Sequence, residues 1–150
     1  MPTPLHYLEI DESWRERLAR EWGGVVERHL HFSDGFSLLA LCGEDPAGLI
    51  SVYWRELPLP LSGVHEGYID IIEVRPEFRR RGIARALVDI SIQRAQAHHA
   101  FQLRAWSSED KTEAIPMWQH LGFGLCPAIT HPRGQEVRGY FVTKVLPPPV

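Results

Sequence analysis

The sequence has few cysteines, no long apolar run and no excess of basic residues. Only two of the 150 residues are cysteines, Cys42 and Cys126, too few for the disulfide framework of a small secreted domain. No segment approaches the roughly 18 consecutive apolar residues that a membrane helix needs. The 16 Lys and Arg are outnumbered by 19 Asp and Glu, which argues against general nucleic-acid binding. We therefore expect a cytoplasmic protein with neither a nucleic-acid nor a membrane partner.

The length of the chain suits one domain with its own core. A chain of this size removes roughly 68 to 70% of its extended surface from water on folding, and 44% of its residues are hydrophobic. We find no repeat and no linker, so one domain over residues 1–150 is expected. Residues 1–12 lack the basic region and the apolar segment of a secretory signal. Both cysteines lie in apolar stretches without metal-ligand spacing, which predicts buried thiols and no metal site.

Strand and helix patterns alternate in an order typical of a mixed α/β sheet. Strands are expected at residues 5–10, 36–42, 48–55, 67–74, 101–106, 123–128 and 137–146, and helices at 11–22, 82–100 and 112–121. The long helix at 82–100 is the crossover between two strands, which such a connection makes parallel. The sequence therefore predicts a mostly antiparallel sheet of about six or seven strands with a parallel central pair and flanking helices.

Basic residues gather where the long helix begins. Five of the 16 lie between Arg75 and Arg85, and three of these, Arg79, Arg80 and Arg81, directly precede a glycine. Cations at the positive end of a helix dipole cost roughly 0.3 to 1 kcal/mol each when exposed. A bound anion reverses that cost, because free N–H groups, a glycine and guanidinium groups together form a phosphate site.

Two other interpretations of the arginine cluster stay open at this point. It is either a solvated helix start without a ligand or a short nucleic-acid patch. Against the patch stand the acidic chain and the absence of aromatic residues between the arginines. The sequence contains neither of the other common phosphate motifs, G-x-x-x-x-G-K-[ST] and G-x-G-x-x-G.

Two segments carry a resemblance to a known family. Residues 74–88, VRPEFRRRGIARALV, resemble the acyl-CoA pyrophosphate loop of the GNAT superfamily of N-acetyltransferases, whose pattern is [QR]-x-x-G-x-[GA]. The residues that match this pattern are Arg79, Arg80, Arg81, Gly82, Ile83 and Ala84. Residues 114–123, AIPMWQHLGF, are similar to the family's AxxLYxxLGF helix and turn. Both motifs occur in the family's order, and the resemblance covers nearly the whole chain.

The resemblance implies a GNAT fold and an N-acetyltransferase that uses acetyl-CoA as cosubstrate. The acetyl group would pass by direct attack, in a ternary complex, to a primary amine of a small molecule, a protein N-terminus or a lysine. The pantetheine arm would pair with the backbone at Ile72 and Val74, and the N–H groups from Arg80 to Ala84 would hold the pyrophosphate. Family members are often dimers, so a homodimer is a further expectation.

Asp70 and Glu73 are the candidate catalytic residues. Two carboxylates in an otherwise apolar strand are costly to bury without a partner or a task, and an attacking amine must lose a proton to a base. Three residues apart, they are expected on opposite faces of the sheet. Asp70 aligns with an acidic residue of many family members, but it could instead pair with Arg104. His29 and His31, without metal-ligand spacing, carry little weight.

The position of the family's acidic tyrosine is occupied by Trp118. An indole N–H does not protonate a thiolate near pH 7, so the tyrosine's role is not carried over. Trp118 is instead expected to pack over the CoA arm or in the core. Three possibilities remain: the thiolate departs unassisted, another group supplies the proton, or the protein is a non-catalytic acyl-CoA-binding or regulatory module.

Overall fold

The structure, a computed structural model, describes residues 3–148. Within that range seven strands form one sheet in the order β1-β2-β3-β4-β5-β7-β6. The strands are β1 (Leu5–Ile10), β2 (Gly35–Cys42), β3 (Asp45–Glu56), β4 (His65–Val74), β5 (Gln102–Ser108), β6 (Gly124–Thr130) and β7 (Val137–Val145). β4 and β5 are parallel, and the other neighbouring strands are antiparallel. The expected fold class is therefore confirmed.

Four α-helices connect these strands in the described range. They are α1 (Arg15–Trp22), α2 (Gly24–Arg28), α3 (Ile83–Ala97) and α4 (Ala114–His120), with 3₁₀ turns η1 (Glu12–Trp14), η2 (Pro76–Phe78) and η3 (Pro132–Gly134). The Asp11 side chain accepts a hydrogen bond from the Ser13 N–H at 2.9 Å, which caps η1 at its start. Gly23, with φ 105°, ends α1. The sequence does not predict α2, which begins directly after α1. Its residue Val26 packs in the core beneath β1–β3.

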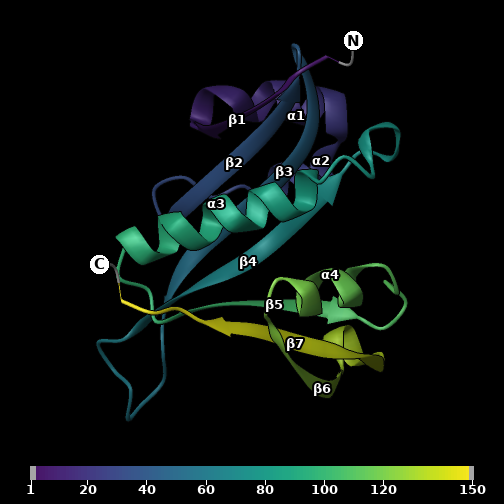
Figure 1. Cartoon of the computed structure of the whole chain (residues 1–150). Coiled ribbons are helices and arrows are strands. Elements are labelled where there is room, and N and C mark those ends of the chain that lie inside the picture. Colours follow the sequence, from purple (N-terminus) through teal and green to yellow (C-terminus); the bar gives the residue numbers. More distant parts are fainter. Residues whose placement is uncertain (1–2, 149–150) are drawn as a thin grey trace.

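Helices cover both faces of the first half of the sheet (Figure 1). On one face α3 packs Leu87 and Val88 against β2, β3 and β4, and the Trp118 side chain of α4 belongs to the same core. On the other face Leu18 of α1 and Val26 of α2 join a second, smaller core.

The cysteines differ from expectation. Cys126 is exposed and Cys42 is half-buried, so the prediction of two buried thiols is wrong. Cys126 lies on β6, the last strand of the sheet order, where an apolar stretch has only one strand neighbour. Among residues 3–148, no helix is both long and apolar enough to cross a membrane.

Candidate functional site

The parallel pair at the centre of the sheet separates after a short contact. β4 and β5 pair only at Gly67 with Leu103, Tyr68 with Arg104, and Ile69 with Ala105. Beyond these positions β4 remains bound to β3 while β5 remains bound to β7, and the two strands diverge (Figure 1). Over residues 70–74, one edge of β4 therefore has no strand partner among the residues that the structure describes.

The turn that leads into α3 lies at the end of this open edge and exposes a row of backbone N–H groups. Arg80 and Gly82 both adopt left-handed backbone conformations, with φ 65° and 75°. The N–H groups from Arg80 to Arg85 have no hydrogen-bond acceptor within residues 3–148. A Cβ atom at Gly82 would meet nothing within 4 Å, so a ligand can approach the backbone there. Successive free N–H groups at a helix start form an anion site.

Guanidinium groups lie on two sides of this turn. The Arg79 Nε donates to the Val74 carbonyl at 3.4 Å, on the β4 side. Arg81 reaches the other way, where it donates to the Thr3 carbonyl at 2.9 Å and contacts the Cys42 sulfur at 3.2 Å. Both side chains remain exposed. The turn therefore combines free N–H donors with positive charge, which suits a doubly charged phosphate group.

A β-bulge in β4 decides where its two carboxylates point. Ile69 and Ile71 pair with adjacent residues of β3, so Asp70 between them has no opposite residue. Ile69 consequently packs in the core beneath α3, whereas Ile71 packs in the core beneath α1 and α2. Glu73, two residues after Ile71, shares its face, and the partners of Asp70 lie on that side too. The prediction that Asp70 and Glu73 face opposite ways is wrong, because the extra residue shifts the alternation by one.

Two histidines from the segment between α2 and β2 bind Asp70. Its Oδ2 atom lies 3.1 Å from His29 Nδ1 and 2.8 Å from His31 Nε2. The other ring nitrogen of His31 lies 2.8 Å from an Asp34 carboxylate oxygen. Sequence reasoning missed this cluster, since about 40 residues separate each histidine from Asp70. The only available signal was the His-x-His spacing just before a predicted strand of the same sheet.

Tyrosine rings continue the cluster along the sheet. The Tyr53 ring lies 4.7 Å from the His31 ring and 5.5 Å from the Tyr68 ring, centroid to centroid. Burial, followed by the influence of Tyr53, raises the pKa of Tyr68 above its ordinary value of 10.0, so its phenol is protonated at neutral pH. The neighbouring Trp54 faces the other side and stacks on His98 at 3.9 Å. Aromatic rings of Tyr53 and Tyr68 therefore border the Asp70 cluster.

Arg104, the alternative partner for Asp70, binds Glu66 instead. Its Nη2 atom lies 2.6 Å from one carboxylate oxygen of Glu66, and its Nε lies 3.1 Å from the other. Gln102 donates to the same carboxylate at 2.7 Å. The Glu66 side chain is only 1% exposed. This buried pair therefore holds β4 to β5 at their paired end, and Asp70 is left to the histidines.

The Glu66 ion pair predicts an acid-sensitive stability. Burial raises the pKa of Glu66, but hydrogen bonds from Arg104 and Gln102 and the charges of Arg104 and Arg55 outweigh it and lower the pKa below 4.5. A lowered folded-state pKa adds stability that is complete above about pH 4.5 and is lost as the pH falls through the folded value. Glu66→Gln should lower the free energy of unfolding at about pH 7 by roughly 2–3 kcal/mol and flatten its fall below about pH 4.5. Urea denaturation measures both, and a variant as stable as the wild type at neutral pH would contradict it.

Trp118, expected to contact the CoA arm or the core, lies in the core. Its side chain is 2% exposed and packs edge-on against Phe123, with ring centroids 4.8 Å apart. Leu121 belongs to the same core. The position therefore contributes packing to the α4 side of the sheet.

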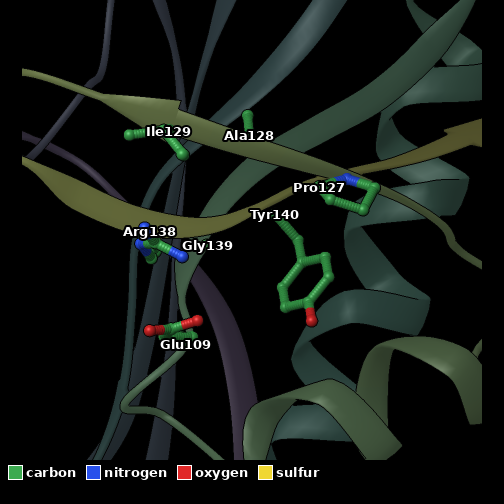
Figure 2. A pocket seen from close by; sticks show the side chains of 7 residues that line it. All are labelled: Glu109, Pro127, Ala128, Ile129, Arg138, Gly139 and Tyr140. Carbon is green, nitrogen blue, oxygen red and sulfur yellow. The ribbon is translucent and has the colours of Figure 1, made fainter.

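A surface hollow of about 500 Å³ lies away from these residues, over the paired strands β6 and β7 and beside Glu109 (Figure 2). Figure 2 shows Arg138 and Glu109 at one end and the Tyr140 ring at the other. None of its lining residues belongs to the turn before α3 or to the Asp70 cluster. Within residues 3–148, no group of three or more His, Cys, Asp or Glu side chains is placed to hold a metal ion.

The sheet thus opens beside a helix start with free N–H groups. The acetyltransferase (GNAT) family model matches residues 5–123. The chain therefore belongs to the GNAT family of acetyltransferases, which confirms the resemblance and the expected enzyme class. None of the curated protein sequences compared with the chain matches it.

Solved structures share the fold over nearly the whole chain. Arabidopsis thaliana NAA60, in complex with acetyl-CoA, has a TM-score of 0.78 at 16% identity, covering 95% of this chain and 100% of its own. A GNAT acetyltransferase of Streptococcus pneumoniae has a TM-score of 0.75 at 14% identity, covering 96% and 100%. The ribosomal-protein-S18-alanine N-acetyltransferase of Escherichia coli has a TM-score of 0.73 at 14% identity, covering 95% and 94%. At such identities the likeness shows the fold.

Proposed function

We propose that this chain, as one catalytic domain, transfers the acetyl group of acetyl-CoA to a primary amine. The observation that carries the proposal is the row of unpaired N–H groups from Arg80 to Arg85 beside the open edge of β4. Acetyl-CoA offers a complement to both features, since it joins a diphosphate to an extended arm with amide groups. A family relative crystallised with acetyl-CoA supports the same choice of cosubstrate.

The order of residues along β4 orients the cosubstrate. With its pyrophosphate on the N–H groups from Arg80 to Ala84, the pantetheine arm runs back along the open edge past Val74 and Ile72. Its thioester end then lies near the bulge at Asp70. The cosubstrate thus brings its reactive carbon to the place where β4 and β5 separate and where the acceptor side holds its carboxylates.

The reaction needs a neutral amine and a leaving thiolate. An alkylammonium group with a pKa near 10.4 is mostly protonated at neutral pH, so a base must take its proton before attack. Asp70 and Glu73, which share the acceptor face, are the catalytic candidates from β4. A CoA thiolate is stable enough to leave without a tyrosine acid, which accords with the burial of Trp118 in the core.

The acceptor is a primary amine on a small molecule, a protein N-terminus or a lysine. Negative side chains on the acceptor face attract a cation, because Asp34, Asp70 and Glu73 lie on or beside it. A structural relative named for the alanine of ribosomal protein S18 favours a protein N-terminus as one acceptor to test.

A non-catalytic acyl-CoA-binding module is the second candidate, favoured by the missing tyrosine at Trp118. Calorimetry with acetyl-CoA, followed by a thiol-release screen over small amines, lysine peptides and peptides with a free alanine N-terminus, separates the two. Binding with release on one acceptor class supports the enzyme. Binding without release on any acceptor supports the module, and absence of binding overturns both.

Removal of the flanking charges should weaken cosubstrate binding. Arg79→Ala combined with Arg81→Ala is expected to raise the Kd of acetyl-CoA by roughly 10- to 100-fold, because a charge-assisted hydrogen bond contributes about 1.5–3 kcal/mol. Calorimetry at low and high salt should also show a shallower salt dependence in the variant. Arg20→Ala, which removes an exposed charge of α1, is the matched control. Equal affinities for variant and wild type would contradict the site.

A further inference from the structure

One carboxylate oxygen organises the acceptor side. Asp70 Oδ2 lies within hydrogen-bond distance of both His29 and His31, while Asp70 itself is 24% exposed. Because an ionised carboxylate only accepts hydrogen bonds, each histidine directs an N–H group at it. The two rings differ in the number of nitrogen atoms that have no hydrogen-bond partner, and this difference separates a positioning role from a catalytic one.

His31 has no free nitrogen. Its Nε2 is directed at Asp70 and its Nδ1 at Asp34, both at 2.8 Å, and its side chain is 17% exposed. Because each ring nitrogen is engaged by a carboxylate, neither is available to take a proton from a substrate. Its packing against Tyr53 adds a further constraint. His31 therefore fixes the position of the Asp70 carboxylate.

His29 has one free nitrogen. Its Nδ1–H is directed at Asp70, which places the lone pair of the neutral ring on Nε2. That Nε2 atom has no hydrogen-bond partner within residues 3–148, and the side chain is 42% exposed. The arrangement is that of a carboxylate that sets the tautomer and orientation of a general-base imidazole.

Two carboxylates and a second histidine lie at the cluster that holds His29. The groups facing the cluster are Asp70 from β4 and His31 and Asp34 from the segment before β2. The rings of Tyr53 and Tyr68 lie beside them.

An imidazole is also a stronger base than a carboxylate for the proton of the substrate amine. Ordinary pKa values are about 6.5 for an imidazole, about 3.9 for an aspartate and about 7.7 to 10.4 for the amines concerned. Transfer from an amine to an imidazole is therefore less unfavourable by about 2.6 pKa units, a factor of roughly 400.

We propose that an Asp70–His29 dyad is the general base of this acetyltransferase, with His29 as the catalytic residue and Asp70 and His31 as positioning residues. The proposal rests on the proposed function. His29 Nε2 takes one proton from the substrate ammonium, and the freed lone pair forms the C–N bond to the thioester carbon. The C–S bond then breaks, its electron pair leaves with CoA, and the second proton of the amine passes to the CoA thiolate. The products are an acetamide, CoA thiol and a proton on His29 that returns to water.

The first test removes the base but keeps its bond to Asp70. In His29→Asn the side-chain NH₂ replaces the Nδ1–H donor and no lone pair remains for the proton. With an amine that the wild type accepts, kcat/KM at about pH 7 should fall roughly 10²- to 10⁴-fold. The acid limb of the pH profile should disappear, whereas the Kd of acetyl-CoA stays unchanged. His6→Asn, an exposed histidine on β1, is the matched control and should keep the wild-type rate and profile.

A spectroscopic measurement distinguishes a positioning role of Asp70 and His31 from a merely structural one. Long-range ¹H–¹⁵N correlation NMR should show the neutral His29 ring protonated at Nδ1 in the wild type. This tautomer should be lost in Asp70→Asn. His31→Ala should lower kcat about tenfold, and His31→Gln, which keeps a donor toward Asp70, should restore most of it. The acid limb should survive in both His31 variants.

The outcomes separate the dyad from the proposed function. An active wild type whose His29→Asn variant keeps the rate and the acid limb overturns the dyad alone. A neutral His29 protonated at Nε2 in the wild type also overturns it, and that measurement needs no acceptor amine. A wild type that binds acetyl-CoA but releases no thiol with any amine overturns the proposed function, whatever the NMR result.

Discussion

Gly82→Val is expected to raise the Kd of acetyl-CoA about 100-fold. Gly82 has φ 75°, a conformation that costs a residue with a side chain roughly 1–2 kcal/mol and is worse for a β-branched one. The space beside it is open, so an isopropyl group would occupy the approach to the N–H groups. Loss of one charge-assisted hydrogen bond adds about 1.5–3 kcal/mol. The free turn of the variant relieves the strain by leaving this conformation, so binding has to restore it. The two costs together amount to roughly 2.5–5 kcal/mol, or at least about two decades in Kd.

The control for this prediction is Gly63→Val. Gly63 has φ 88° and no atom within 4 Å of its Cβ position, but it lies in the loop between β3 and β4, away from the turn. The strain of the two substitutions is therefore matched, while only Gly82 borders the free N–H groups. Calorimetry with acetyl-CoA should find wild-type affinity for Gly63→Val. If both variants bind alike, the turn before α3 is not the pyrophosphate site.

Local patterns were enough to predict the fold and the turn. Alternating strands, the crossover over residues 82–100 and the arginines before Gly82 are contiguous features, and each is governed by nearby backbone physics. The free N–H groups from Arg80 to Arg85 follow from this local sequence and from the left-handed conformations at Arg80 and Gly82. Contiguous sequence therefore predicts the proposed cosubstrate side well.

The proposed acceptor side could not be predicted in the same way. One extra residue at Asp70 reverses the alternation along β4, and no residue type marks a bulge in advance. His29 and His31 reach Asp70 only because β2, β3 and β4 are neighbours in the sheet. From the sequence, Arg104 could have paired with Asp70. In the structure it pairs with Glu66, because β4 and β5 are hydrogen-bonded to each other at that end of β4. These are contacts of tertiary structure that sequence spacing does not encode.

Trp118→Ala is expected to lower the free energy of unfolding by about 3–5 kcal/mol, the range for truncating a buried aromatic residue. Trp118 is 2% exposed and packs edge-on against Phe123, so the truncation leaves a cavity between α4 and the sheet. A domain with a total stability of roughly 5–15 kcal/mol would lose a large part of it. Urea denaturation measures the loss directly.

The same position decides between packing and cosubstrate contact. A core role predicts that Trp118→Phe, which keeps an aromatic ring against Phe123, recovers most of the stability, and that all the folded variants bind acetyl-CoA with nearly the wild-type Kd. A role over the CoA arm predicts the reverse, with weakened binding and little change in unfolding. The ring lies beneath the surface rather than at the open edge of β4. We therefore expect substitutions of Trp118 to change the free energy of unfolding and to leave the Kd of acetyl-CoA nearly unchanged. A Trp118→Ala variant that is as stable as the wild type but has a tenfold higher Kd for acetyl-CoA would contradict the core role and indicate that Trp118 contacts the cosubstrate.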